Sequence, residues 1–399
     1  MARPAQRLRV AEGRGERAPL PRRTVPSMQT AWPHMLVPRP AAAVPLVFPF
    51  DQPGLRFRYF CRNAVWDAAQ LLGLRGKKVL MPAYHHGVEL ETLLAAGVTP
   101  VFFRVDGQMR ADFDDARAKA QGAAALYVIH YAGFPQDMAA ARQLAAELGV
   151  PLVEDCALAL LSADEEKPLG SFGDLSLFCF YKTIPVPNGG ALLARGDFAR
   201  KLSQLEEVAA PPLASTASHL CGSLLSNLEL RAGEVGRRAR QALREASRWM
   251  VSRAHVQRVS TGTQHFNLGD VKLGMSAASH VIARNQDFAG IVERRRRNYF
   301  LLYAMLRDVA PPVTGELKPG VCPLFYPMPV DDKAGAMARL LARGVETVDF
   351  WRVRHPAVPA GAFPEVDGLR ERVLELPVHQ DLSPADAEHV ATCVRELLK

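Results

Sequence analysis

The residues with the most reactive side chains stand directly after apolar stretches of the chain. Lys182 follows the apolar run LSLFCFY, and Asp155 ends the apolar segment PLVED. The amine of a lysine at a partly desolvated strand end can act as a nucleophile. A carboxylate in the same setting needs a cation or a hydrogen-bond donor, because burying a lone charge is costly. From its position alone, each residue could equally be an ordinary charge at a strand end.

Histidines and tyrosines follow other apolar stretches in the same way. Tyr84, His85 and His86 come after KKVLMP, His130 comes after LYVI, and His379 lies in LPVHQDL. Such side chains could contact a cofactor or substrate, or they could be ordinary hydrogen-bonded residues. No carboxylate or cysteine at ligand spacing completes a set with these histidines, so we expect no metal site.

The segment after Lys182 has an unusual composition. It reads TIPVPNGG, and its two prolines exclude a simple helix or a central strand. The paired glycines Gly189 and Gly190 permit positive φ angles or a close approach of another backbone. We therefore expect a tight, irregular loop directly beside the lysine.

The surrounding pattern alternates strands and helices, which predicts how these segments are brought together. Strands are expected at 77–84, 99–106, 123–133 and 150–160, and helices at 63–74, 85–97, 111–122 and 137–149. This order is typical of βαβ units, so the fold class is α/β, with three α/β/α layers around a mostly parallel sheet. In such sheets ligands bind at the carboxyl ends of the strands, where Asp155 and Lys182 would lie.

The rest of the chain has a different pattern. Residues 200–258 are helical and charged, 275–306 form one long helix or a broken pair, and short strands and helices follow residue 309. We expect a large domain over 51–290 and a small α+β domain over 291–399, which ends in a helix that begins at Ser383-Pro384. Residues 1–50, rich in Pro and Arg, are predicted to form an extended or partly disordered arm.

Composition narrows the class of protein. The 399 residues contain no apolar stretch long enough to cross a bilayer and no secretory leader, and the six cysteines are scattered. We therefore expect a cytoplasmic protein with reduced thiols and no membrane partner. The net charge of +8 is concentrated in a few segments, among them the arginine run 294–297, which we place on a solvated helix face. No nucleic-acid motif accompanies these residues, so we interpret them mainly as solvated basic helix faces, with a polyanionic small molecule such as a nucleotide diphosphate as the alternative.

Three long segments resemble one known family. They are KKVLMPAYHHGVELETLLAAGVTPVFFRVDGQ, ALYVIHYAGFPQDMAAARQLAAELGVPLVEDCALAL and KPLGSFGDLSLFCFYKT with the later NGGALLA. Their order and spacing are similar to those of the DegT/StrS-type sugar aminotransferases, which depend on pyridoxal 5'-phosphate (PLP) and have the aspartate-aminotransferase-like fold. Weaker similarity continues to the C-terminus, so the resemblance covers roughly two-thirds of the chain.

The resemblance implies a role for each matching residue. Lys182 would form a Schiff base with PLP, Asp155 would pair with the pyridine nitrogen, and His86 would cover the ring. The start of the helix at Arg62, Asn63 and Ala64, together with Cys179, would take the phosphate. Tyr84, His85, His130 and His379 would lie near the substrate.

The family also implies an activity and an assembly. The reaction would move an amino group from an amino-acid donor, glutamate by analogy, to a keto-sugar, most plausibly a nucleotide-linked one. The active site would lie at the interface of a homodimer.

Several positions depart from the family pattern. Leu158 replaces a Gln, Cys179 replaces a Ser, and the loop after Lys182 is shorter than is common. The segment KLGMS also lacks the usual Asn and Arg. A different PLP-dependent reaction, such as a dehydration or an amino-acid transformation, and a non-catalytic relative therefore stay open as alternatives.

Overall fold

The computed structural model describes residues 24–38, 46–239, 241–242 and 266–399. Its centre is a seven-stranded sheet with the order β1-β9-β8-β5-β4-β2-β3. Neighbouring strands from β3 to β8 are parallel, whereas β9 is antiparallel to both β8 and β1. The strands are β1 Leu55–Arg58, β2 Lys78–Pro82, β3 Thr99–Phe103, β4 Ala123–Ile129, β5 Leu152–Cys156, β8 Leu175–Cys179 and β9 Gly190–Ala194.

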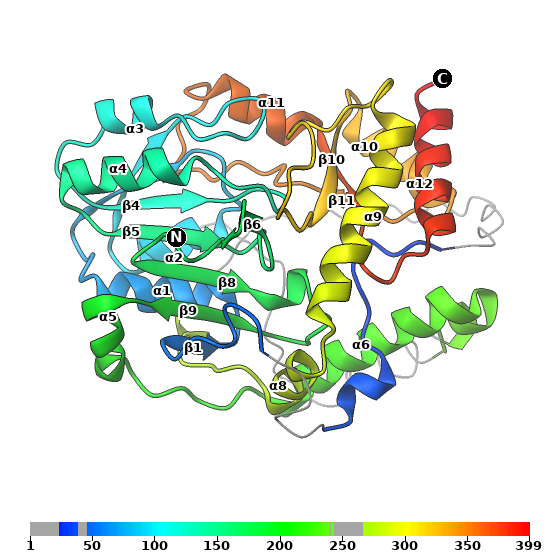
Figure 1. Cartoon of the computed structure of the whole chain (residues 1–399), viewed down its shortest axis with the longest axis horizontal. Coiled ribbons are helices and arrows are strands. Elements are labelled where there is room, and N and C mark those ends of the chain that lie inside the picture. The colour runs from blue at the N-terminus through cyan, green and yellow to red at the C-terminus, as the bar shows by residue number, and fades with distance from the viewer. Residues whose placement is uncertain (1–23, 39–45, 240, 243–265) are drawn as a thin grey trace, which may run out of the picture.

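Helices cover both faces of this sheet (Figure 1). They include α1 Cys61–Leu71, α2 Val88–Ala95, α3 Phe113–Ala118, α4 Met138–Leu148 and the short α5 Gly196–Arg200. The core on one face joins residues of α1 and α2 to inward-facing strand residues such as Val79. The core on the other face joins residues of α3 and α4 to Leu80 and Leu126. The expected α/β fold with a mostly parallel sheet is confirmed, and the helix expected at 63–74 begins two residues earlier, at Cys61.

A smaller antiparallel sheet follows in the C-terminal part of the chain. Its strands are β10 Phe325–Pro329, β11 Val348–Asp349 and β12 Val373–Pro377, in the order β10-β12-β11. The helices around it are α10 Lys333–Ala342, α11 Pro364–Arg372 and α12 Pro384–Leu397. Ser383 caps α12 by accepting the N–H of Asp386, as the Ser-Pro start predicts.

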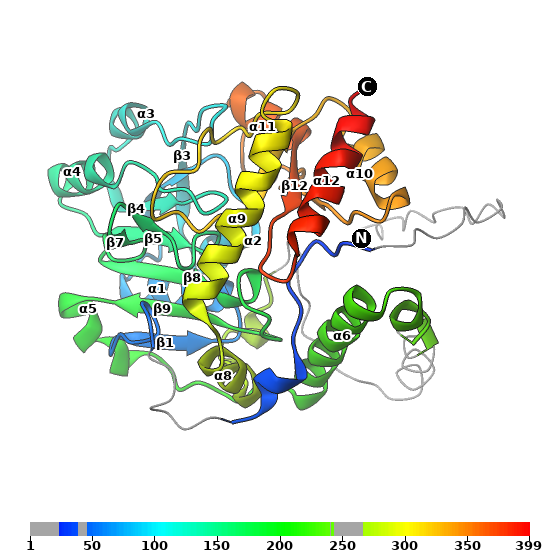
Figure 2. The same cartoon turned by 45° about the vertical axis from the view of Figure 1, so that its right-hand side comes forward.

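The helical segment 275–306 is a broken pair. It forms α8 Ala277–Arg284 and α9 Phe288–Leu306, and Asp287 caps α9 by accepting the N–H of Gly290 at 2.9 Å. Helix α9 runs between the large sheet and α12 in both views (Figures 1 and 2). The predicted boundary at 290 thus falls within the first turn of α9.

The remaining elements lie around these two sheets. They are α6 Leu213–Ala232, the hairpin β6 Ala163–Asp164 and β7 Lys167–Pro168, and the 3-10 helices η1 Pro33–Leu36, η3 Phe180–Lys182, η4 Leu202–Gln204 and η5 Leu268–Asp270. Of the helical segment expected at 200–258, residues 240 and 243–258 lie outside the described residues. Among the described residues, no helix combines the length and apolar character needed to cross a membrane.

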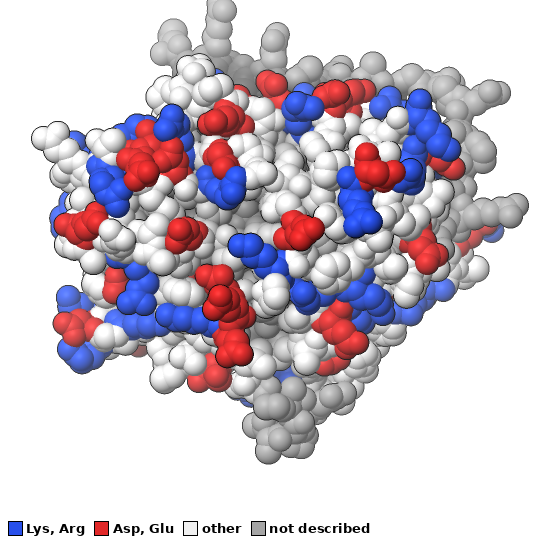
Figure 3. Space-filling view, turned by 45° about the horizontal axis from the view of Figure 1, so that its top comes forward, with Lys and Arg blue, Asp and Glu red and all other residues white. Residues whose placement is uncertain are grey.

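The first fifty residues are described only over 24–38 and 46–50. Val25 forms a bridge with Val345 of the C-terminal part, and Thr30 is bound through its N–H and hydroxyl to Asp381. This segment therefore links the N-terminal arm to the C-terminal region. Figure 3 shows Lys and Arg intermixed with Asp and Glu over one face of the molecule, so the net positive charge does not form a single basic patch there.

Candidate active site

One pocket of about 470 Å³ lies where the large sheet meets the C-terminal region. It is lined by strand-end residues of the large sheet, by the start of α1, by β11 and β12, and by residues 27–29 of the N-terminal segment. This volume lies within the range typical of small-molecule sites. The predicted location at the strand carboxyl ends therefore coincides with a real cavity.

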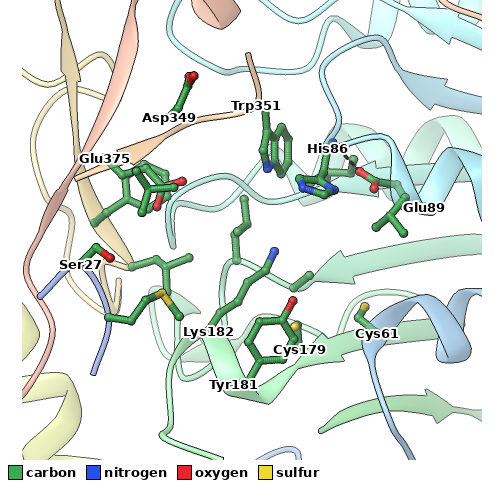
Figure 4. A pocket seen from close by; sticks show the side chains of 18 of the residues that line it. Ser27, Cys61, His86, Glu89, Cys179, Tyr181, Lys182, Asp349, Trp351 and Glu375 are labelled. Carbon is green, nitrogen blue, oxygen red and sulfur yellow. Dashed lines mark hydrogen bonds between the residues drawn. The ribbon is translucent and has the colours of Figure 1, made fainter. Parts of the chain in front are cut away.

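Lys182 projects into this pocket from η3, directly after β8 (Figure 4). The loop behind it is held by Asn188, whose side-chain oxygen accepts the N–H of Ser276 at 2.8 Å. Gly190 touches the chain at the start of α1, and a Cβ there would lie 2.3 Å from the backbone N of Cys61. The glycine is required because only a residue without a side chain lets the two backbones meet. The irregular loop thus fixes Lys182 relative to α1.

The first turn of α1 forms another part of the wall. Phe60, Cys61 and Arg62 line the pocket, and a helix N-terminus carries partial positive charge and N–H groups that favour anions. Asn63 is used internally, since its side chain accepts the N–H of Phe60 at 3.1 Å and donates to the carbonyl of Asp270 at 2.5 Å. Ala64 is buried in the core. Of the three predicted phosphate-binding residues, Arg62 alone has its side chain among those that line the cavity.

Asp155 lies at the end of β5 and is 4% exposed. Its Oδ2 accepts the hydroxyl of Tyr127 at 2.5 Å, and its Oδ1 accepts the N–H of Ala157 at 2.8 Å. Burial raises the pKa of Asp155 to about 6, against the opposing effect of the Tyr127 hydrogen bond. At neutral pH the group is still a carboxylate, and a cationic partner in the pocket would stabilise that form.

His86 and Trp351 bring two rings to the pocket from different parts of the chain. The rings meet edge to face with their centroids 6.2 Å apart. The N–H of His86 donates to Glu89 Oε1 at 2.7 Å, which fixes the loop after β2. Burial and the nearby positive charge of Lys182 lower the pKa of His86 to about 4. The imidazole is therefore neutral at physiological pH and can cover a flat ligand as an uncharged ring.

Cys179 also lines the pocket, at the end of β8. Burial raises the pKa of its thiol, so the group stays protonated at neutral pH. A thiol is a weaker hydrogen-bond donor than the serine hydroxyl of the family pattern. Any anion held here depends mainly on the start of α1.

The structure does not bring all predicted residues into the pocket. Tyr84, His85 and His130 are buried beside it, in the protein interior. His130 Nδ1 accepts the N–H of Gln136 at 3.0 Å, which leaves Nε2 to donate to Glu154 Oε1 at 3.1 Å. His379 lines the pocket, but its Nε2 lies 2.9 Å from the carbonyl oxygen of Pro26, to which it can donate. His130 is thus a satisfied interior histidine.

Within the described part of the chain, one cluster of side chains could hold a metal ion. It consists of His130, Glu154 and Cys156, whose ligand atoms lie within 4.8 Å of one another. The Glu154 carboxylate already accepts hydrogen bonds from His130 and from the backbone N–H groups of Gly170, Phe172 and Gly173. Its oxygens are therefore engaged in holding the loop before β8. This arrangement explains the cluster without an ion.

Several pocket residues were missed by the sequence reasoning. Glu375 and Asp349 come from β12 and β11, Trp351 follows β11, and residues 27–29 come from the N-terminal segment. Glu375 is a lone carboxylate in the apolar strand VLELP, the same signal that singled out Asp155. Nothing in the local sequence indicates that the other residues reach the site.

The arginine run 294–297 was predicted to be solvated, and this is wrong for Arg295. Arg295 is 1% exposed, and its guanidinium donates to Gln380 Oε1 at 2.8 Å, to Gln29 Oε1 at 3.1 Å and to the carbonyl of Thr183 at 3.3 Å. Four consecutive helical residues point around the whole helix, so one of them must face inward. Arg295 thereby ties the residue after Lys182 to the N-terminal segment and to the C-terminal region.

The residues present fit PLP. Lys182 offers an amine, Asp155 offers a buried carboxylate for a cationic ring nitrogen, and the start of α1 offers a positive end for a phosphate. His86 and Trp351 add flat apolar surface beside them. These groups line one cavity, although they come from distant parts of the chain.

Comparison with known proteins supports this arrangement. Residues 63–217 match the model of the DegT/DnrJ/EryC1/StrS aminotransferase family. This segment includes Asp155, Cys179 and Lys182, so the resemblance seen in the sequence is confirmed.

Curated relatives match over about a third of the chain. GDP-perosamine synthase of Vibrio cholerae is 32% identical over 135 residues, which cover 33% of this chain and 37% of that protein. UDP-N-acetyl-3-dehydro-alpha-D-glucosamine 3-aminotransferase of Acidithiobacillus ferrooxidans is 31% identical over 136 residues, which cover 33% of this chain and 37% of that protein. The chain thus spans little more than a third of the length of these relatives.

A solved structure extends the likeness over most of the chain. The aminotransferase TlmJ of Streptoalloteichus hindustanus superposes with a TM-score of 0.62 and 24% identity, covering 86% of this chain and 85% of that one. At this identity the likeness shows the fold, over a larger share of the chain than the sequence matches cover.

Proposed function

We propose that this protein is a PLP-dependent aminotransferase, which moves an amino group from an amino-acid donor to a keto-sugar. One observation supports this most strongly: Lys182 and Asp155, both at strand carboxyl ends, line one pocket with the start of α1. Glutamate is the proposed donor by family analogy.

When bound, PLP supplies an electron sink that stabilises negative charge at the carbon next to the transferred amine. Lys182 would provide the amine that holds the cofactor and would then move a proton to and from that carbon. Asp155 would hold a proton on the ring nitrogen, because a buried carboxylate with a raised pKa is stabilised by a cation beside it. A base already held beside its target gains a large rate advantage from proximity alone.

The other pocket residues position Lys182 and enclose the cavity. His86 and Trp351 offer ring surfaces to the pocket, and the buried Arg295 holds the backbone next to Lys182 in place. Residues 27–29 and β12 close the pocket on the side of the C-terminal region. These contacts restrict water around the reacting atoms, which strengthens the electrostatic interactions inside.

The proposed acceptor is a nucleotide-linked keto-sugar. The relatives described above are named for GDP- and UDP-linked sugars, and the pocket wall includes the cationic side chains of Arg62 and Arg352. A guanidinium suits a diphosphate because it donates several hydrogen bonds from one rigid plane.

We also propose a cytoplasmic homodimer. Helix α6 and the residues after it leave large apolar side chains exposed, among them Leu213 and Val235. Exposed apolar groups on one projecting helix favour contact with a second copy of the chain. Sedimentation of the purified protein would give the mass of a dimer if this proposal is right.

The test of the proposed function is spectroscopic. Purified protein mixed with PLP should gain the absorbance band of a lysine-bound cofactor, and L-glutamate should convert that band to the one of the aminated cofactor. Lys182→Ala should lose the first band, whereas Lys201→Ala, a change at an exposed lysine, should keep it. A protein that stays colourless with PLP would contradict every catalytic interpretation and leave the non-catalytic relative.

A further inference from the structure

Glu375 is a pocket residue that the proposed chemistry does not use. It lies in the middle of β12, the central strand of the small sheet, opposite Pro327 of β10 and Val348 of β11. Its side chain is half-buried and lines the pocket on the wall formed by the C-terminal region. Figure 4 shows Glu375 and Lys182 on different walls of the same cavity.

Four carboxyl groups line this pocket, and three of them are held by the protein. Glu89 accepts the N–H of His86, Asp155 accepts the hydroxyl of Tyr127, and Asp349 forms an ion pair with Lys333 at 2.5 Å. Glu375 forms no hydrogen bond and no ion pair within the described part of the chain. A carboxyl that faces the pocket without a protein partner can form its hydrogen bonds with a ligand there.

The environment of Glu375 favours its neutral form. Burial raises the pKa of Glu375 to about 8, although the positive charges of Lys182 and Lys333 oppose this shift. A neutral carboxyl offers one O–H donor and one carbonyl acceptor side by side. A hydroxyl group matches this pair, because it can accept from the O–H and donate to the carbonyl oxygen.

An anionic group of a ligand is a poorer partner for Glu375 than a hydroxyl group. A phosphate or carboxylate offers acceptors alone, so it would leave the carbonyl oxygen of Glu375 without a donor. Asp349, on the adjacent strand, adds negative charge on the same side, although Lys333 offsets part of it. The diphosphate of a nucleotide sugar therefore belongs toward Arg62, at the start of α1.

We propose that Glu375 binds a hydroxyl group of the sugar acceptor. This inference rests on the proposed function, because it concerns the acceptor of the same pocket. Glu375 is then a specificity-determining residue with no part in proton transfer.

The test compares nucleotide sugars with bare nucleotides. Calorimetry on the PLP-loaded protein would measure the dissociation constants of GDP-mannose and UDP-glucose beside those of GDP and UDP. The hexose should improve affinity about 10-fold or more for at least one pair, as expected of hydrogen bonds that a buried polar group makes only with the sugar. Glu375→Leu should lose most of this advantage, whereas the affinity for the bare nucleotide should stay unchanged.

Two variants act as controls. Glu375→Gln keeps a donor and an acceptor, so it should retain the hexose advantage within about threefold. Glu371→Leu changes an exposed glutamate of the preceding helix and should have no effect. The proposal is overturned if Glu375→Leu keeps the full hexose advantage, or if neither hexose improves the affinity of the unaltered protein. It is also overturned if Glu375→Gln behaves like Glu375→Leu, since a charge would then be required.

A separate measurement distinguishes failure of this inference from failure of the proposed function. The conversion of bound PLP by L-glutamate does not involve the sugar, so in the unaltered protein it tests the proposed function alone. If that conversion is normal and the hexose comparison fails, the assignment of Glu375 is wrong and the aminotransferase proposal stands. Thermal unfolding by circular dichroism checks that each variant is folded.

Discussion

Glu154 and Asp155 are adjacent on β5, yet their side chains meet opposite surroundings. Glu154 is turned to one face of the sheet, where His130 and three backbone N–H groups donate to its oxygens. Asp155 is turned to the pocket, where it accepts one hydroxyl and one N–H. The first carboxylate is fully used by the protein, and the second keeps capacity for a ligand.

The pKa values of the two groups move in opposite directions although both are buried. Burial alone would raise the pKa of Glu154, but the hydrogen bonds from His130 and from the backbone lower it on balance. The pKa of Asp155 rises to about 6, because burial outweighs its fewer hydrogen bonds. The number of donors, rather than burial, therefore separates a structural carboxylate from one available for chemistry.

The largest effect is expected from Asp155→Asn. An amide cannot carry the negative charge that keeps the cofactor's ring nitrogen protonated, so the rate of conversion by L-glutamate should fall about 10³-fold, or about 4 kcal/mol. Stability should not fall, because the change removes a buried carboxylate whose pKa is raised. Single-turnover absorbance and urea unfolding would measure the two quantities. A rate loss below tenfold would mean that Asp155 is no more than structural.

The reverse result is expected from Glu154→Gln. In the unaltered protein the Glu154 carboxylate accepts backbone N–H groups, whereas the NH₂ group of the glutamine would face them as a second donor. Each buried donor left without an acceptor costs about 1–3 kcal/mol. The free energy of unfolding in urea should therefore fall by about 2–3 kcal/mol. At temperatures well below unfolding, the cofactor band and its conversion by L-glutamate should persist. If the variant stays stable but loses conversion, the contrast between the two carboxylates is wrong.

The smallest effect is expected from Tyr127→Phe, which sharpens the comparison by changing one donor to Asp155. The hydroxyl stabilises the charged form, so its loss should raise the pKa of Asp155 further above 6. The carboxylate is needed, and activity is lost as pH falls through this pKa. The acid limb of the pH–rate profile should therefore move to higher pH, with a loss of about 1 kcal/mol near pH 6 and less at pH 8.

An acid limb that does not move in Tyr127→Phe would contradict this assignment. Tyr131→Phe is a matched control, because the Tyr131 hydroxyl donates to the carbonyl of Tyr84 and not to Asp155. Its pH–rate profile should keep the acid limb of the unaltered protein.

Much of the large sheet and its contribution to the pocket could be predicted from the sequence. The alternation of apolar strands and amphipathic helices predicts a mostly parallel sheet. Ligands bind at the carboxyl ends of the strands in such sheets, which predicts that Asp155 and Lys182 lie at one site. Both steps depend on local patterns, because each βαβ unit is continuous in the chain. His130 also follows a strand, but the prediction that it lies near the substrate is wrong. Its side chain is hydrogen-bonded to Glu154, on the face of the sheet away from the pocket.

The opposite wall could not be predicted because its residues meet only through the tertiary structure. Trp351 and Glu375 reach the pocket through the docking of the small sheet, and residues 27–29 reach it through the pairing of Val25 with Val345. The Arg295 guanidinium donates hydrogen bonds to both the N-terminal segment and the C-terminal region. The sequence shows only that Arg295 is one of four successive arginines. Contacts between residues so far apart in the sequence cannot be predicted from local spacing.

The most direct test of the account is to identify the residue that binds the cofactor. PLP-loaded protein would be reduced with sodium borohydride, which fixes the cofactor on its lysine, and then digested for peptide mass spectrometry. The account predicts that the added mass lies on Lys182, the residue that projects into the pocket from η3. Added mass on another lysine, or on none, would contradict it.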